Sequence, residues 1–445
     1  MQGNSSSEKV FLEFDVYKRV AKLVLNIYGK VKKMAIIRPF KAWRPVPQRA
    51  SLIASPPYDV VDYKQSMEIG KDNPLSFIHV VRAEIGLPAG TEPHSAAVYQ
   101  KAAENLEAFI KNGALVEEDQ PVFYAYSQRL GGHFQTGIVG CFSVDDYDSD
   151  VIKKHEKTRR DKEDDRLHHI LATSAQTGPV FLMYKDSTHV ETILENVCAY
   201  TPAFFSFLAP DGVEHIVHRI SDPACIKQIT EEVARIGSLY VADGHHRSAA
   251  SSRARAERQK ANPHHTGTEE YNYFMGVLFP ASSLKILPYN RVVKDLNGLS
   301  KEEFLTRIRH HFKFSETENP IPAMKGHFGM YLDKRWYLLM DKPWEHKSDD
   351  PVANLDVQIM QDYLLDPVLG IKDPRTDNRI SFVGGIHGHQ KLKKMVDDGE
   401  GAVAFLMYPV KPEDITAISD AGRIMPPKST WFEPKLRSGL FIHKI

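Results

Sequence analysis

The stretch from Ser238 to Ala250 constrains this chain more than any other part of it. Four apolar residues are followed by an acidic residue, a glycine, two histidines and an arginine, and then by small residues and good helix formers. This order predicts a buried strand, a tight turn and the start of a helix. The first backbone N–H groups of a helix lack intrahelical partners and carry partial positive charge, so the junction suits an anion such as phosphate.

The polar residues of this junction have distinct candidate roles. Gly244 would allow positive φ or close approach of a ligand, and Arg247 would grip phosphate oxygens with two parallel hydrogen bonds. Asp243 would orient a hydroxyl group or hold Mg²⁺, while His245 and His246 would donate hydrogen bonds or carry a proton. The alternative is structural: Asp-Gly is a common turn, and Asp243 would then be an ordinary helix cap.

A second polar segment, residues 152–171, is densely charged and lies between apolar stretches. A charged run is usually a solvated surface with pairs spaced four residues apart. Mobile segments between strands also form lids over nucleotides, and this one carries phosphate-binding cations and a candidate base. On that second interpretation His155, Glu156 and Arg166 would take part in the site.

Two double prolines and one polar strand end are further candidates. Pro56 and Pro57 would hold Tyr58 and Asp59 in a fixed extended geometry, which suits a site but also a plain loop. A second double proline precedes Lys428, Ser429 and Thr430, and Asn290 and Arg291 end a predicted strand. Each set would either face the same site or only close a sheet.

Composition limits the function classes. Lys plus Arg and Asp plus Glu both number 57, so the formal net charge is zero, which argues against nucleic acid and anionic membranes as partners. No apolar run reaches the length of about 18 residues that a membrane span requires. The three cysteines, Cys141, Cys198 and Cys225, are too widely spaced for a zinc site or a disulfide framework, so we expect a cytoplasmic protein.

Strand and helix patterns alternate along the 445 residues. They predict an α/β (α+β) fold with a mixed sheet, flanking helices and two lobes that meet at the motifs. Among the predicted elements are strands at 72–84, 121–130 and 134–144, a helix ending at Gly113, a helix over 220–237, and paired strands at 271–280 and 283–293. The predicted divisions are a peripheral N-terminal extension (1–33), an N-terminal α/β lobe (34–210) and a lobe containing the DGHHR sequence with a C-terminal α/β extension (211–445).

Six motifs in order resemble those of a family of bacterial proteins, domain of unknown function 1015. They are PF at 39–40, SPPYDVV at 55–61, HEKT with DRL at 155–167, ADGHHR at 242–247, LPYNRV at 287–292 and MPPKSTWFEPKLRSGL at 425–440. The resemblance covers essentially Met34 to Ile445. Within LPYNRV, Asn290 stands where this family is expected to have a histidine, which weakens a proton-transfer role there.

The ADGHHR motif is also similar to the phosphate-binding motif of the ParB and sulfiredoxin superfamily, which includes free L-serine kinases. This resemblance implies a ParB/sulfiredoxin-like core in which Gly244, His245, His246 and Arg247 bind nucleotide phosphates and Asp243 belongs to the reacting centre. The catalytic glutamate of those kinases has no matching motif here, and Glu156 is the candidate on chemical grounds.

The resulting hypothesis is a small-molecule kinase that uses ATP or ADP and Mg²⁺ to phosphorylate a hydroxyl, such as that of L-serine. Asp243 would hold the metal, Glu156 or His246 would accept the proton, and Arg166 would help to bind the nucleotide. The alternatives are a non-catalytic nucleotide-binding module of the ParB kind and a hydrolase that releases phosphate. The acceptor and the oligomeric state do not follow from the sequence.

Overall fold

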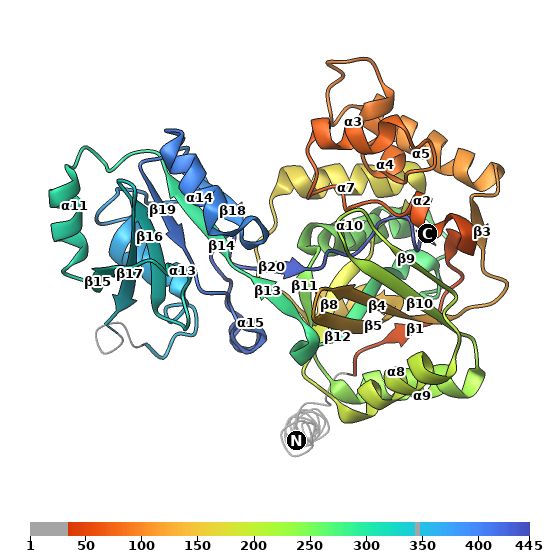
Figure 1. Ribbon diagram of the computed structural model, residues 1–445. Helices are drawn as coiled ribbons and strands as arrows, with labels where there is room; N and C mark the ends of the chain where they lie inside the picture. Colours follow the sequence, from red (N-terminus) through yellow and green to blue (C-terminus); the bar gives the residue numbers. More distant parts are fainter. Residues whose placement is uncertain (1–33, 343–347) are drawn as a thin grey trace, which may run out of the picture.

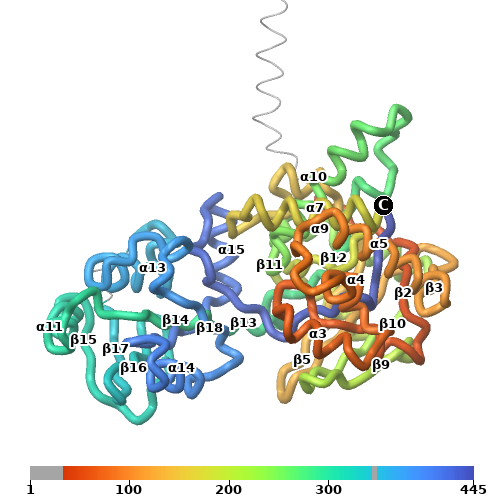
Figure 2. Tube along the Cα trace, turned by 90° about the horizontal axis from the view of Figure 1, so that it is seen from above, coloured from red at the N-terminus to blue at the C-terminus, as the bar shows by residue number. Residues whose placement is uncertain are grey.

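The computed structural model describes residues 34–342 and 348–445. The predicted N-terminal extension, residues 1–33, lies outside the described residues. Two lobes lie side by side, each built on its own sheet (Figures 1 and 2). Within the described ranges, every helix is too short or too polar to cross a membrane.

The main lobe is built on a nine-stranded sheet with the order β6-β11-β8-β12-β5-β4-β10-β9, and β1 pairs with β5. β12 runs parallel to β8 and β11 runs parallel to β6, while the remaining pairs are antiparallel, so the sheet is mixed. The bounds are β1 Ile37–Arg38, β4 Phe123–Leu130, β5 His133–Ser143, β6 Ile152–Lys153, β8 Val180–Tyr184, β9 Phe205–Leu208, β10 Glu214–Ile220, β11 Leu239–Asp243 and β12 Tyr273–Pro280.

Both faces of this sheet carry buried apolar side chains, which alternate along each strand. Val241 and Leu182 belong to one apolar cluster, whereas their chain neighbours Tyr240 and Met183 belong to another. Successive residues of a strand point to opposite faces, so each strand contributes to both clusters. Helices α8 (Thr188–Tyr200) and α9 (Pro223–Ile236) cover the first face, at the bottom of Figure 1.

The other labelled helices of the main lobe lie on the opposite side and at the edge of the sheet (Figure 1), whereas α6 contributes Val144 and Tyr147 to the first cluster. α10 packs against α7 through Leu167, Ile170, Ala250 and Ala254. The bounds are α2 Ala50–Ile53, α3 Tyr63–Lys71, α4 Ile78–Val81, α5 Ala96–Lys111, α6 Val144–Asp148, α7 Arg160–Thr173 and α10 His245–Ala261. Two short pairs complete the lobe: β2 (Trp43–Pro45) with β3 (Leu115–Glu117), and β7 (Ala175–Gln176) with β21 (His443–Lys444).

The smaller lobe contains a six-stranded sheet with the order β15-β17-β16-β19-β14-β18. Its strands are β14 Tyr289–Val293, β15 Phe312–Glu316, β16 His327–Leu332, β17 Arg335–Asp341, β18 Ile380–Gly384 and β19 Val403–Leu406. Its helices are α11 Lys301–Ile308, α13 Asp356–Met360, α14 Gly388–Asp397 and α15 Pro412–Asp420.

The chain leaves the main lobe through β13 (Lys285–Leu287) and returns through β20 (Trp431–Glu433), and these two strands pair antiparallel. The C-terminal segment then crosses the main lobe, as the blue tube in Figure 2 shows. It forms bridges from Ser438 to Ser55 and from Ile442 to Trp43. The C-terminal motif and the SPPYD motif are therefore neighbours in the folded protein.

The mixed α/β class predicted from the sequence is confirmed, as are the strands at β4 and β5 and the helices α5 and α9. Two element predictions are wrong. Residues 72–84 contain the short helix α4, because Phe77, Ile78, Val80 and Val81 are all buried in a cluster with α5 that needs apolar residues on more than one side. The segments 271–280 and 283–293 do not pair with each other, since β12 lies between β5 and β8.

The predicted boundary between residues 210 and 211 falls inside the nine-stranded sheet, between the adjacent strands β9 and β10. The segment 152–171 is also not a loop. Most of it forms α7, whose residues Asp165 and Arg166 are buried.

Candidate functional site

The stretch Ser238–Ala250 folds as a strand, a turn and a helix. β11 ends at Asp243, Gly244 adopts φ 96°, and α10 begins at His245. The first amide of the helix to bond within it is that of Ser248, which donates to the Gly244 carbonyl at 2.9 Å. The amides of residues 245–247 therefore precede the intrahelical bonds, and they give this end of the helix its positive potential.

Gly244 is required here for two reasons. Its φ lies in the left-handed region, which L side chains rarely adopt. A Cβ atom at this position would also lie 3.1 Å from both Cζ and Nε of Arg247. The arginine is thus folded back over the turn, directly beside the start of α10.

The Arg247 guanidinium is only partly satisfied. It donates to the Pro179 carbonyl, and its Nη2 lies 3.9 Å from Oδ1 of Asp243. Its Nε is buried and has no hydrogen-bond partner within the described ranges. A buried donor without a partner is costly, so an acceptor supplied by a ligand would be favourable here.

Two carboxylates face the same space. Lys435 donates to Oδ2 of Asp243 at 2.8 Å. Burial alone would raise the pKa of Asp243, but the Lys435 ammonium and the Arg247 guanidinium outweigh it and hold the pKa well below its usual range. Burial and the charge of Asp243 raise the pKa of Glu156, while Lys428 and Lys435 counteract this. Asp243 is therefore an ionised anchor, and Glu156 is the more basic carboxylate.

Residues from β14, from β20 and from the segments on either side of β20 lie near these two carboxylates. The rings of Tyr289 and Trp431 meet edge to face with centroids 5.3 Å apart. Lys428 Nζ lies 5.2 Å from the Tyr289 ring centroid, and Lys435 Nζ lies 4.9 Å from that of Trp431. Burial, followed by the charges of Asp243 and Glu156, raises the pKa of Tyr289. Lys428 also has a left-handed backbone, with φ 55°, which is uncommon outside glycine and concentrates at functional sites.

The two adjacent histidines have different surroundings. His245 is buried against His155, with ring centroids 4.4 Å apart, and its Nδ1 lies 3.8 Å from Oε2 of Glu156. Burial lowers the pKa of His155 to about 4, and burial together with His155 lowers that of His245, so both rings are neutral. His246 is half-buried on the other side, where its Nε2 accepts a hydrogen bond from the Arg159 backbone N–H at 3.2 Å.

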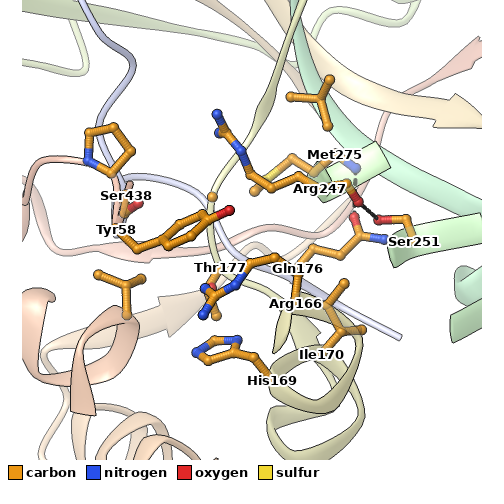
Figure 3. A pocket seen from close by; sticks show the side chains of 14 residues that line it. Tyr58, Arg166, His169, Ile170, Gln176, Thr177, Arg247, Ser251, Met275 and Ser438 are labelled. Atoms are coloured by element: carbon orange, nitrogen blue, oxygen red, sulfur yellow. Dashed lines mark hydrogen bonds between the residues drawn. The ribbon is translucent and has the colours of Figure 1, made fainter. Parts of the chain in front are cut away.

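Behind the turn lies a narrow cavity of about 30 Å³, and both Arg247 and Arg166 contribute to its wall. The phenol of Tyr58 lies between these two arginines (Figure 3). The Arg166 guanidinium sits 3.8 Å above the Tyr58 ring and donates twice to Oδ2 of Asp165, at 2.9 and 2.6 Å. In this conformation the cavity has room for little more than a water molecule. Arg166 is held in place by its chain neighbour Asp165.

The structure therefore divides the predicted site residues into groups. Asp243, Glu156 and His245 lie together with Gly244 and Arg247 at the turn, whereas Arg166 lies behind Arg247 and His246 faces Arg159. Sequence analysis missed Lys435, although it belongs to the quoted C-terminal motif. It also missed the buried acceptor Asp165, which receives hydrogen bonds from Arg166, from Tyr99 and from His94.

A divalent metal would need ligands from outside the protein. No group of three or more His, Cys, Asp or Glu side chains in residues 34–342 and 348–445 is arranged to hold a metal ion. Mg²⁺ commonly uses one or two carboxylates together with substrate phosphates and water. Asp243 and Glu156 fit that pattern only in the presence of a phosphate ligand.

Residues 37–358 match the family model described as protein of unknown function, DUF1015. The chain belongs to the DUF1015 family. This confirms the family predicted from the six motifs.

Solved structures resemble this DUF1015 protein only distantly. A conserved hypothetical protein from Pyrococcus furiosus aligns with a TM-score of 0.33 and 13% identity over 68% of this chain and 94% of its own. A free serine kinase in complex with AMP aligns with a TM-score of 0.34 and 11% identity over 68% and 91%. SbnI with a C-terminal truncation, from Staphylococcus aureus, aligns with a TM-score of 0.35 and 10% identity over 68% and 86%. A search of curated protein sequences finds no match.

Proposed function

We propose that this protein is a phosphotransferase that moves a phosphoryl group from ATP or ADP to the hydroxyl of a small metabolite, with free L-serine as the first candidate. One observation carries the proposal. At the start of α10, Lys435 contacts the carboxylate Asp243 and acts on the charge of the second carboxylate, Glu156, beside helix amides whose positive potential favours an anion.

The nucleotide phosphates would bind at the turn. The free amides of residues 245–247 point out of the helix end, and the helix dipole favours a negative group there. Arg247 would exchange its contact with the Pro179 carbonyl for phosphate oxygens, which also satisfies its buried Nε. Lys428 and Lys435 supply further positive charge from the connection between the lobes.

Glu156 is the proposed proton acceptor. Because burial and Asp243 raise its pKa, it binds a proton more readily than an ordinary glutamate does near neutral pH. His245 lies beside it and is neutral, so it can orient the carboxylate without competing as a cation. We do not assign the proton to His246, whose Nε2 already accepts a backbone hydrogen bond.

Asp243 would hold Mg²⁺ through the carboxylate oxygen that Lys435 does not contact, with Glu156 close by. A bound Mg²⁺ would neutralise charge on the transferred phosphoryl group. The reaction further requires the nucleotide and the acceptor to be held in the correct orientation. The rigid turn and the two proline-fixed segments around Tyr58 and Lys428 would provide this orientation.

The proposal is tested by incubating the full-length protein with Mg²⁺ and either ATP or ADP, with and without L-serine and a panel of hydroxylated metabolites. Phosphorus NMR then distinguishes three outcomes. A new phosphate ester supports the phosphotransferase. Phosphate released without an acceptor indicates a hydrolase, and nucleotide binding without turnover indicates a non-catalytic module.

Two variants assign the roles. Glu156→Gln should lower kcat by about 10²–10⁴-fold, because it removes the proposed proton acceptor, and it should affect nucleotide affinity less than Arg247→Ala does. Arg247→Ala should instead weaken nucleotide binding. Glu231→Gln is the matched control, since this exposed residue of α9 lies on the other side of the sheet. Unchanged nucleotide affinity in Arg247→Ala would refute the assignment of that residue.

A further inference from the structure

A second pocket lies in the smaller lobe, where β14, β18, α13 and the segment before Lys428 come together. Its volume is about 410 Å³, far larger than that of the cavity behind Arg247. Its apolar lining includes Val352, Phe382 and Met425. Neither the turn at Gly244 nor the nucleotide role assigned to it uses this pocket.

Arg291 is the most unusual residue in the wall of this pocket. It is only 3% exposed, and its guanidinium lies 5.6 Å from the ring centroid of Phe382. It donates to the Tyr289 carbonyl, but no described Asp or Glu lies within ion-pair distance of it. Burial alone lowers its pKa to about 10. A buried cation without a counterion is costly unless an anion is bound beside it.

The rest of the pocket wall also favours a negatively charged ligand, as Arg291 does. Lys157, Lys372 and Arg375 are cationic, and Asp373 is the one acidic residue in the described wall. Asp373 is already bonded to Arg375 at 3.0 and 3.1 Å, so it does not neutralise Arg291. The wall is therefore positive overall, and it favours a negatively charged guest.

Gln361 adds a hydrogen-bond acceptor to a wall whose other polar groups are mainly cationic donors. Its side-chain nitrogen donates to the Ile371 carbonyl at 2.8 Å, which fixes the orientation of the amide. Its Oε1 is buried and has no hydrogen-bond partner in the described part of the chain. This acceptor suits a hydroxyl or ammonium group carried by the same ligand as the anion.

The pocket adjoins the proposed phosphotransfer site through three chain connections. Lys157 follows Glu156, and Pro427 precedes Lys428. Tyr289 and Arg291 stand two residues apart on β14, so they share one face of the strand at a spacing of roughly 7 Å. A small molecule held by Arg291 would thus extend toward Glu156 and Asp243.

We infer that this pocket is the acceptor subsite and that Arg291 binds an acidic group of the acceptor, either a carboxylate or a phosphate monoester. The substrate class is therefore hydroxylated small acids, with the anion on Arg291 and the reacting hydroxyl toward Glu156. This inference rests on the proposed phosphotransfer function for the fate of the hydroxyl. The binding of an acidic guest by Arg291 can be tested separately.

The test measures binding before turnover. ADP is first titrated into the full-length protein, and a failure to bind ADP would count against the proposed function only. The midpoint of thermal unfolding is then measured with D-glycerate, with sn-glycerol 3-phosphate and with neutral glycerol, in the presence of excess ADP. We expect at least one acidic probe to raise the midpoint and glycerol to leave it unchanged. The two acidic probes distinguish a carboxylate from a phosphate preference.

Variants then locate the effect. Arg291→Met should abolish the shift, and Lys157→Glu, an exposed substitution that does not threaten folding, should reduce it strongly. Arg309→Met is the matched control, because this exposed arginine of the same lobe lies over the Phe314 ring and is not part of the pocket wall. In the transfer assay, Arg291→Met should raise KM for acidic acceptors by about tenfold or more, as expected for the loss of a charge-assisted hydrogen bond.

The inference is overturned if neither acidic probe stabilises the wild-type protein, or if the shift survives in both Arg291→Met and Lys157→Glu. If Arg291→Met does not fold, Lys157→Glu alone decides between the two results. A shift that depends on Arg291 in a protein that binds no ADP would keep the acidic pocket and reject its place in phosphotransfer.

Discussion

Replacing Gly244 with alanine should damage both the fold and the anion site. At φ 96° an L residue adopts an unfavourable backbone conformation, which costs about 1–2 kcal/mol. The new Cβ would lie 3.1 Å from the Arg247 guanidinium and would push it away from the Pro179 carbonyl. The loss of one hydrogen bond from a charged group costs about 1.5–3 kcal/mol. The free energy of unfolding should therefore fall by about 2.5–5 kcal/mol.

Gly212→Ala is a matched control for the backbone term. Gly212 has φ 80°, and a Cβ there would meet nothing within 4 Å. This variant should lose only the cost of about 1–2 kcal/mol for the backbone. Urea denaturation of both variants therefore isolates the contribution of the Arg247 contact.

Calorimetric titration with ADP completes the experiment. Gly212→Ala should bind ADP as the wild-type protein does. Gly244→Ala should bind it at least about tenfold more weakly, equivalent to about 1.4 kcal/mol, because the helix end and Arg247 are both displaced. Equal losses of stability in the two variants, together with an unchanged Kd for ADP in Gly244→Ala, would refute the reasoning.

Three further predictions concern titratable groups in or beside the site. Burial lowers the pKa of His155 from 6.5 to about 4 in the folded protein. Between these pH values the unfolded chain binds more protons than the folded protein does, so the free energy of unfolding should fall as the pH drops from 6.5 to 4. Urea denaturation at several pH values should show a smaller fall in the free energy of unfolding for His155→Gln than for the wild-type protein. An identical fall would exclude His155 as a cause of the pH dependence. Asp165→Asn should lose about 3–5 kcal/mol of stability, because it leaves the buried Arg166 without its partner. Exposed Asp161→Asn should leave the stability nearly unchanged, and similar losses in the two variants would contradict this. Lys435→Met removes a charge that lowers the pKa of Glu156, so the acid limb of the kcat/KM profile should move to higher pH, and an unmoved limb would separate Lys435 from Glu156.

Local patterns in the sequence predicted the centre of the site. The apolar run, the glycine and the helix formers between Ser238 and Ala250 act within a few residues of one another, so their order was sufficient to predict strand, turn and helix. The start of α11 depends on a similarly local signal, since Ser300 and Glu303 form a capping box within three residues. The family could also be predicted, since its six motifs are short and lie in a fixed order.

Contacts that depend on the path of the chain were not predictable in this way. Lys435 reaches Asp243 across 192 residues, after the smaller lobe has been completed and β20 has paired with β13. Nothing local to Lys435 indicates that partner. Arg291 was only one of several candidate site residues in the sequence, and its lack of a counterion is visible only once the pocket around it has formed.

Burial explains the remaining differences. The charged segment 152–171 has the composition of a solvated loop, yet Asp165 and Arg166 satisfy each other inside α7 and can therefore be buried. The run from Phe77 to Val81 is apolar except for His79, and such a short pattern does not distinguish a strand from a buried helical turn. Its packing against α5 decides for the helix.

A crystal structure of the protein with ADP would test the anion site most directly. The proposed function predicts the terminal phosphate within about 2.7–3.2 Å of the amide nitrogens of residues 245–247, with Arg247 turned from the Pro179 carbonyl onto the phosphate oxygens. ADP bound elsewhere, with Arg247 still on Pro179 and the start of α10 in contact with water alone, would contradict it.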